Sequence, residues 1–280
     1  MDYYLDVEQE KNVLNANIAV HTRMIHDYES EPHWRPENIA KVKNRLQGVL
    51  PRNRGKALDV GAGTGFLTRL LTPIFDEVTA IDITEPMLAK IPKTSNLNII
   101  VAQAEELPFE SDSFDFVCAY SFLHHLYDPD KVLKEMIRVL KPGGTIYVDL
   151  EPNSAYWKKL KEIDESQIEV QSPVVKREIN ATVHIEKYIE EQYAIPQEIF
   201  AAAEYSKSVT GGFNADKLRN LLISLGILSV EVNLDWFMGQ ALVMHSKSFE
   251  LASEIEKHLR EILPASEHLF KYIWMTGEKK

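Results

Sequence analysis

The expected fold starts from one stretch of sequence, Ala57-Leu58-Asp59-Val60-Gly61-Ala62-Gly63-Thr64-Gly65-Phe66. An apolar run typical of a buried strand leads into three alternating glycines, and a helix-like run with Leu67, Leu70 and Leu71 follows. Glycines let the backbone turn tightly and approach a ligand closely, and a helix N-terminus presents unpaired N–H groups to a negative group. The stretch therefore predicts a strand, a ligand-holding turn and a helix, with a purely structural turn as the alternative.

The spacing of residues around this turn narrows the ligand. A dinucleotide-binding turn needs a third glycine at position 66, where this chain has Phe66, and no Gly-Lys-Ser/Thr follows to make a phosphate-binding loop. About 20 residues later a strand ends in Asp82, whose carboxylate can accept hydrogen bonds from ribose hydroxyls. A nucleoside is therefore favoured over NAD, although Asp82 as a plain helix cap stays an alternative.

Strand-like and helix-like runs alternate from about Lys56 onward, which is typical of a mostly parallel sheet with helices on both faces. We predict an α/β, Rossmann-like fold with a seven-stranded sheet and helical cap insertions. The expected strands are Ala57–Val60, Glu77–Asp82, Leu97–Gln103, Phe114–Ser121, Thr145–Leu150, Ser229–Trp236 and Phe270–Met275. The last of them is expected at an exposed edge, and because such edges pair with other copies, a homodimer is one expectation.

The domain organisation follows from where this alternation holds and where it lapses. We expect a single domain over residues 1–280, because 280 residues suit one large domain with insertions. The predicted parts are an N-terminal helical cap over 1–47, a ligand-binding core over 48–152, a helical cap insertion over 153–210 and a C-terminal completion of the sheet over 211–280.

Composition limits the partners and the location. A formal net charge of −11 disfavours a broad basic face for DNA or RNA. The chain does not start with a basic segment followed by an apolar one, and no apolar run approaches the ~20 residues that span a bilayer. Cys118 is the single cysteine, which suits a reducing compartment. We expect a cytoplasmic protein that binds neither nucleic acid nor membrane.

Metal and serine-hydrolase chemistry are not expected. Adjacent His124 and His125 cannot both face one ion from a regular helix, and no His-Glu-x-x-His motif occurs. The chain also lacks a Gly-x-Ser-x-Gly segment, which would place a nucleophilic serine on a sharp turn.

Five blocks together carry a resemblance to a known family, and they are Asp59–Phe66, Asp82–Leu88, Gln103–Phe109, Ser121–Leu126 and Arg138–Gly144. In this order, over roughly 56–151, they make the chain similar to the class I S-adenosylmethionine-dependent methyltransferases. The small-molecule group related to the ubiquinone-biosynthesis methyltransferases is the most similar. The resemblance implies S-adenosylmethionine as cofactor and S-adenosylhomocysteine as its product.

The resemblance also implies which residues hold the cofactor. Asp59 and the backbone of the loop would bind the methionine end, Asp82 the ribose, and Ile83 the adenine face. Gln103 stands where the family usually has aspartate, and its amide can still accept a hydrogen bond from the adenine amino group. The complete expected set is Asp59, Gly61, Ala62, Gly63, Thr64, Gly65, Asp82, Ile83, Gln103, Ala104, Glu105 and Ser121.

The methyl acceptor is expected to be a small molecule with a nitrogen, oxygen or carbon nucleophile. His124 is the first candidate for a general base, with His125 or a purely structural role for either histidine as alternatives. Tyr28 and Glu151 are expected in the wall that faces the substrate or cofactor. A sensor or partner subunit that binds the cofactor without transferring its methyl group is the alternative function, and an NAD-linked dehydrogenase is a third.

Overall fold

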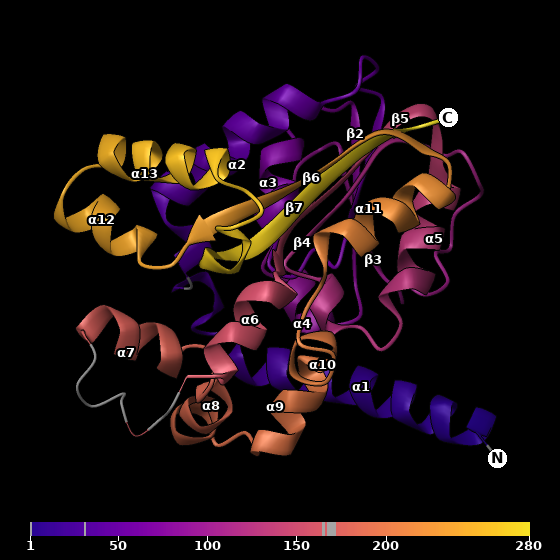
Figure 1. Ribbon diagram of the computed structural model, residues 1–280. Helices are drawn as coiled ribbons and strands as arrows, with labels where there is room; N and C mark the ends of the chain where they lie inside the picture. The colour runs from indigo at the N-terminus through magenta and orange to yellow at the C-terminus, as the bar shows by residue number, and fades with distance from the viewer. Residues whose placement is uncertain (1, 31, 164–165, 167–171) are drawn as a thin grey trace.

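A computed structural model describes residues 2–30, 32–163, 166 and 172–280 of the chain. Figure 1 shows one central sheet with helices packed on its two sides and a group of helices beyond one end of the strands. The sheet has seven strands in the order β3-β2-β1-β4-β5-β7-β6. They are β1 (Lys56–Val60), β2 (Glu77–Asp82), β3 (Leu97–Val101), β4 (Phe114–Tyr120), β5 (Leu140–Pro152), β6 (Ile227–Phe237) and β7 (Phe270–Lys279).

The first five strands are parallel, whereas β7 pairs antiparallel with both β5 and β6. The predicted α/β fold with a seven-stranded, mostly parallel sheet is therefore confirmed. Parallel strands bring their carboxyl ends to one edge of the sheet, and ligands of such folds bind there.

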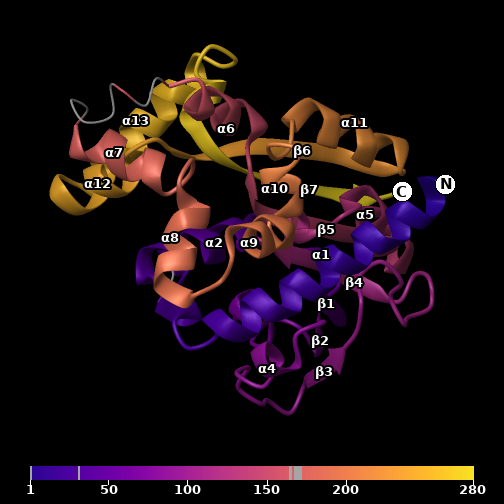
Figure 2. The same cartoon turned by 90° about the horizontal axis from the view of Figure 1, so that it is seen from below.

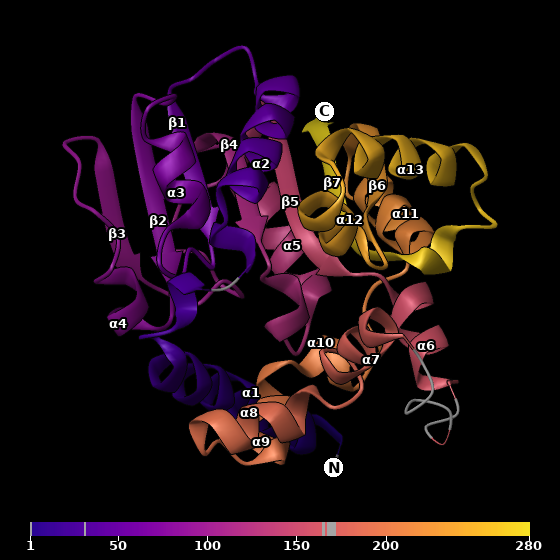
Figure 3. The ribbon, with the colours of Figure 1, turned by 90° about the vertical axis from the view of Figure 1, so that its left-hand side faces the viewer.

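Side chains along each strand point alternately to the two faces of the sheet, and each face packs against its own layer of helices. Ala57 and Phe116 face one side, where they pack with α2 (Pro36–Val49) and α3 (Phe66–Leu71). Leu58 and Val117 face the other side, where they pack with α5 (Pro129–Val139) and α11 (Ala215–Ser224). Figure 3 shows α2 and α3 in front of the strands and α5 behind them. Both faces are buried because side chains of a strand point alternately to its two sides.

The helices beyond the carboxyl ends of the strands form the cap. They are α1 (Asp2–Met24), α6 (Ser154–Lys161), α7 (Pro173–Asn180), α8 (Ile185–Tyr193), α9 (Gln197–Ala203) and α10 (Tyr205–Ser208). An apolar cluster joins α1 to α8 and α9 through Ala16, Val20, Ile189 and Phe200. Figure 2 shows α1 running across this end of the sheet with α8 and α9 beside it. Segments more than 150 residues apart thus form one cover, whereas α2, which falls within the expected N-terminal cap over 1–47, packs on a face of the sheet.

The remaining helices are α4 (Glu85–Leu88) after β2, and α12 (Gln240–Ser246) with α13 (Phe249–Glu261) between β6 and β7. Among the helices of the described residues, none combines the length and the apolar character needed to traverse a lipid bilayer.

Several strand predictions are wrong in detail. The strands β5, β6 and β7 are longer than expected, with β5 beginning at Leu140 rather than Thr145. The strand expected at the edge, β7, lies between β5 and β6, and the two edges are β3 and β6. Apolar alternation marks a strand but does not say which neighbours it pairs with. The homodimer expectation loses the exposed β7 edge on which it was based. The third strand ends at Val101, so Gln103 lies in the following turn.

Candidate functional site

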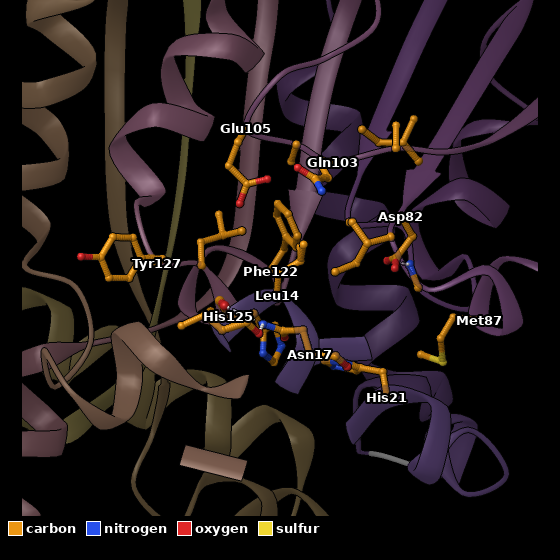
Figure 4. A pocket seen from close by; sticks show the side chains of 18 of the residues that line it. Leu14, Asn17, His21, Asp82, Met87, Gln103, Glu105, Phe122, His125 and Tyr127 are labelled. Carbon is orange, nitrogen blue, oxygen red and sulfur yellow. Dashed lines mark hydrogen bonds between the residues drawn. The ribbon is translucent and has the colours of Figure 1, made fainter. Parts of the chain in front are cut away.

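A cavity of about 400 Å³ lies at the carboxyl ends of the strands, beneath α1. Its walls come from the glycine loop after β1, from the segments after β2, β3 and β4, and from one face of α1, as Figure 4 shows. The lining includes Gly61, Gly63, Asp82, Ile83, Gln103, Ala104, Glu105, Ser121, Phe122, His125, Tyr28, Leu14, Asn17 and His21. Residues that follow four different strands of the expected core therefore line the same cavity as residues of the N-terminal cap.

The glycine loop needs its glycines for two different reasons. Gly61, Gly63 and Gly65 have φ angles of 69°, 53° and 88°, a region that residues with a side chain rarely adopt. A Cβ on Gly61 would also lie 2.1 Å from the ring of Phe122. Backbone conformation and close approach together require glycine at position 61.

Asp82, at the end of β2, ties the loop to the cavity. One carboxylate oxygen accepts the Gly63 N–H at 2.9 Å, and the other accepts the Thr84 N–H at 2.8 Å. The second bond is a capping contact, since Thr84 precedes α4. Both readings of Asp82 are therefore compatible: it supports the helix start and it lines the cavity.

Asp59 has a different place from the one that the resemblance implied. Its side chain is buried, accepts the Thr68 hydroxyl at 2.6 Å, and is outside the cavity lining found among the described residues. Burial raises the pKa of Asp59 to about 7. Asp59 therefore anchors α3 to β1 behind the loop. Ala62, Thr64 and Gly65 are likewise outside that lining, whereas the other expected cofactor residues lie along it.

Glu151 and His124 lie behind the cavity rather than in its lining, as far as the described residues go. The Glu151 carboxylate accepts the backbone N–H groups of Phe122 and Leu123 at 2.9 and 2.8 Å. It also accepts the Nδ1–H of His124 at 2.9 Å. These bonds satisfy a buried carboxylate and hold the turn after β4 in place. Glu151 and His124 therefore support the turn that borders the cavity.

His125 is the histidine that reaches the cavity. Its Nδ1 donates to the carbonyl oxygen of Ala203 on α9 at 2.8 Å. Burial, with His124 adjacent, lowers the pKa of His125 well below its usual value, so the ring is neutral near pH 7. The carboxylate of Glu204 lies 3.5 Å from Nδ1. This buried ring is therefore held by the cap on one side and opens to the cavity on the other.

The same turn brings three metal-ligand types together. Atoms of His124, His125 and Glu204 lie within 4.8 Å of one another. The argument that adjacent histidines must diverge is wrong here, because both lie in the 3-10 turn Leu123–His125 rather than in an α-helix. Lys207, however, pairs directly with Glu204 and supplies a positive charge. Although burial opposes it, Lys207 holds the pKa of Glu204 well below its usual range.

The N-terminal region was expected to form a cap, but the residues of α1 that line the cavity were not among the predicted site residues. Glu10, Leu14, Asn17 and His21 line the cavity and recur every three or four residues along one face of the helix. That spacing was a usable signal, but polar residues on a helix face ordinarily indicate solvent exposure. Phe122 was also missed, because its side chain is recognisable as a wall only once the turn after β4 is placed against Gly61.

Comparisons with known proteins agree with this geometry. Residues 58–148 match a family model described as a methyltransferase domain. An uncharacterised protein of Methanocaldococcus jannaschii is 32% identical over 137 residues, which cover 48% of this chain and 63% of that protein. The demethylmenaquinone methyltransferase of Staphylococcus aureus is 38% identical over 134 residues, which cover 39% of this chain and 56% of that enzyme. The chain thus spans less than two thirds of either relative.

A solved structure from Thermotoga maritima, of an S-adenosylmethionine-dependent methyltransferase described as a possible histamine N-methyltransferase, has the same fold. The TM-score is 0.55 at 18% identity, with 94% of this chain and 99% of that chain covered. At this identity the likeness extends to the fold alone. The likeness covers most of the chain and is therefore not confined to residues 58–148.

Proposed function

We propose that residues 58–148, which match the methyltransferase family model, form a class I S-adenosylmethionine-dependent methyltransferase domain similar to those of quinone biosynthesis, and that the protein transfers a methyl group from S-adenosylmethionine to a small molecule. The observation that carries the proposal is one continuous cavity, which extends from the glycine loop and Asp82 to His125 beneath α1. One space can therefore accommodate both a nucleoside cofactor and a methyl acceptor.

The residues along the cavity fit the cofactor. Gly61 and Gly63 bring bare backbone to the cavity wall, and Asp82 provides a carboxylate at the end of β2. Ile83 would contact the adenine face, and the amide of Gln103 would bind its edge. When bound, S-adenosylmethionine supplies an electrophilic methyl group. Asp59 would act on the cofactor only indirectly, by fixing α3 behind the loop through Thr68.

The protein's own part in the reaction is alignment, exclusion of water and acceptance of a proton. Helix α1, packed against α8 and α9, covers the acceptor end of the cavity, and no residue of α6–α10 is in the lining found among the described residues. His125, rather than His124, is our candidate proton acceptor, because its neutral ring lines the cavity. His124 would be a positioning residue that acts through the turn it shares with His125.

Calorimetric titration with S-adenosylmethionine and S-adenosylhomocysteine tests the cofactor assignment. Wild-type protein should bind both, and Asp82→Asn should weaken binding on the order of ten-fold, because a neutral amide replaces a charged acceptor. Asp76→Asn is the matched control, since Asp76 is exposed in the turn before β2. Absence of binding heat with either compound in the wild type would refute the proposal.

Incubation with methyl-labelled cofactor and a metabolite extract tests transfer itself. Label should appear in a product that is not the cofactor, and His125→Gln should reduce that labelling while calorimetric binding of S-adenosylhomocysteine is retained. Cofactor binding without any labelled product would instead support a sensor or partner subunit.

A further inference from the structure

Three neighbouring polar side chains form one wall of the cavity at the end where the cap meets α1. These residues, Asn17, His21 and His125, are called the acceptor wall below, and Figure 4 shows them close together. The rings of His21 and His125 meet edge to face with their centroids 4.8 Å apart. The Asn17 amide donates to the backbone carbonyl of His125 at 2.9 Å. The three side chains therefore present one continuous polar surface.

The hydrogen bonds of these three side chains show which of their atoms donate and which accept. Both hydrogens of the Asn17 amide are used, on the carbonyls of Val13 and His125. The Nδ1 atoms of His21 and His125 each lie 2.8 Å from a backbone carbonyl, of Asn17 and Ala203 respectively. A carbonyl oxygen can only accept, so each Nδ1 carries the hydrogen.

What remains on the acceptor wall is a set of hydrogen-bond acceptors. They are Oδ1 of Asn17, Nε2 of the neutral His125 ring and, where the His21 ring carries its one hydrogen on Nδ1, Nε2 of His21. Within the part of the chain that the structure describes, these three atoms have no hydrogen-bond partner. A ligand that pairs with them must donate hydrogen bonds, because these three atoms can only accept.

The charges around the cavity point the same way. Glu10, Asp82 and Glu105 contribute carboxylates to its lining, whereas Lys11 is the one basic side chain of that lining within the described residues. A carboxylate or phosphate would meet hydrogen-bond acceptors at the acceptor wall, in a cavity whose lining carries more acidic than basic side chains. An ammonium group supplies hydrogen-bond donors for the acceptor wall and a positive charge that the carboxylates of the cavity lining favour.

We infer that the methyl acceptor is an amine, bound through its N–H groups by the acceptor wall. This inference rests on the proposed methyl transfer. The amine arrives as an ammonium ion and gives one proton to Nε2 of His125, which becomes an imidazolium. The nitrogen lone pair then forms a bond to the methyl carbon as the carbon–sulfur bond breaks, and that electron pair stays on sulfur. The products are the N-methylated ammonium ion and S-adenosylhomocysteine.

Glu204, where the cap meets the turn after β4, partly offsets the burial that keeps His125 neutral. The Glu204 carboxylate lies 3.5 Å from Nδ1 of His125. Lys207 keeps that carboxylate ionised. A fixed negative charge beside the ring stabilises the imidazolium, as a carboxylate does for histidine in other general-base pairs. Glu204 is a positioning residue in this scheme, since it acts through His125.

The test uses the full chain, methyl-labelled S-adenosylmethionine and a metabolite extract separated by ion exchange near neutral pH into cationic, neutral and anionic pools. We expect the label to enter the cationic pool on the order of ten-fold more than either other pool. Label that enters mainly the neutral or anionic pool overturns the amine but leaves the proposed function standing. No label from any pool, with the cofactor bound, overturns both.

His21→Phe supplies a second measurement, because it keeps an aromatic ring against His125 and removes one acceptor. With the cationic pool as substrate, the KM should rise on the order of ten-fold while kcat changes little. His26→Phe is the control, since His26 is exposed just after α1. An S-adenosylhomocysteine-induced rise in Tm equal to that of the wild type shows that the variant is folded. An unchanged KM in such a folded variant contradicts the role of the acceptor wall.

Discussion

At the scale of single residues, Gly61 and Gly143 distinguish two reasons why a position requires glycine: a positive φ angle and the lack of room for a side chain. Their φ angles are similar, 69° and 74°, but a Cβ on Gly61 would overlap the Phe122 ring and one on Gly143 would have no neighbour within 4 Å. We expect Gly143→Ala to cost about 1 kcal/mol of unfolding free energy from backbone strain alone. Gly61→Ala should cost about 2 kcal/mol more and abolish S-adenosylhomocysteine binding.

Urea unfolding and calorimetry of the two glycine variants check this prediction. Adding Phe122→Ala to Gly61→Ala should recover part of the stability, because it removes the side chain that the new methyl group meets. Equal losses in the two single variants would show that overlap with Phe122 plays no part.

His33 predicts how stability depends on pH. It lies among Phe66, Tyr120 and Trp34, and burial lowers its pKa from 6.5 to about 4. Between these two pH values the unfolded chain binds a proton that the folded chain does not, so this contribution to stability is lost as the pH falls from 6.5 towards 4. His33→Phe should lose less Tm than the wild type between about pH 7 and about pH 5.

Differential scanning calorimetry at the two pH values, with Phe in place of His33, gives the comparison directly. The other titrating groups are common to both proteins, so the difference isolates this ring. An identical pH dependence in the two proteins would mean that His33 titrates normally in the folded state.

At the scale of elements, the cap is joined to the turn after β4 by a small polar cluster. Ser206 of α10 donates to the carbonyl of Leu126 at 2.9 Å, and Glu204 pairs with Lys207 between the cap and the histidines. Lys207 also lies over the ring of Trp157 at 5.3 Å. The buried pair is therefore part of how the cap docks, besides its action on His125.

Removing one partner of that pair should be costly. Lys207→Met leaves the Glu204 carboxylate buried without its cation, and we expect a loss of about 3 kcal/mol of unfolding free energy. The double variant Lys207→Met with Glu204→Gln should regain most of it, because no charge is left uncompensated. Urea unfolding measures both.

An exposed pair serves as the reference for the Lys207 variants. Lys159 and Glu162 pair with side chains 59% and 61% exposed, so Lys159→Met should change stability by less than about 1 kcal/mol. A double variant no more stable than Lys207→Met alone would show that packing, and not the pairing of charges, accounts for the loss.

At the scale of the whole molecule, a buried ionic cluster joins the two ends of the chain. Arg45 of α2 donates to Asp149 of β5 at 2.7 Å and to Asp235 of β6 at 2.5 Å. Asp235 also pairs with Lys41, and both carboxylates are almost completely buried. The N-terminal helix α2 and the C-terminal part of the sheet are therefore held together by charges that water does not screen.

This cluster predicts that unfolding involves both ends together. Arg45→Met should cost about 3 to 5 kcal/mol, because two buried carboxylates lose a shared cation. Unfolding should stay a single transition when followed by circular dichroism and by tryptophan fluorescence. Arg52→Met, at an exposed position just before β1, should have little effect. Separate transitions with the two probes would contradict the coupling.

The local part of the site was accessible from sequence. Short-range patterns predict the first strand, the three glycines and the helix after them. Asp82, Gln103 and Ser121 lie at or just beyond the ends of β2, β3 and β4, which belong to the parallel part of the sheet. Because parallel strands present their carboxyl ends at one edge, residues that follow such strands meet there whatever the rest of the chain does. This is why the fold and the family could be predicted.

Only the tertiary structure determined which residues line the end of the cavity that would hold the methyl acceptor. Asn17 and His125 are 108 positions apart, and no local pattern says that α1 crosses the strands above the turn after β4. Which of two adjacent histidines faces the cavity depended on the 3-10 turn and on a carbonyl of α9, and the place of β7 depended on its partners. Short-range periodicity encodes an element and its buried face, whereas contacts between distant elements depend on how all the faces pack at once.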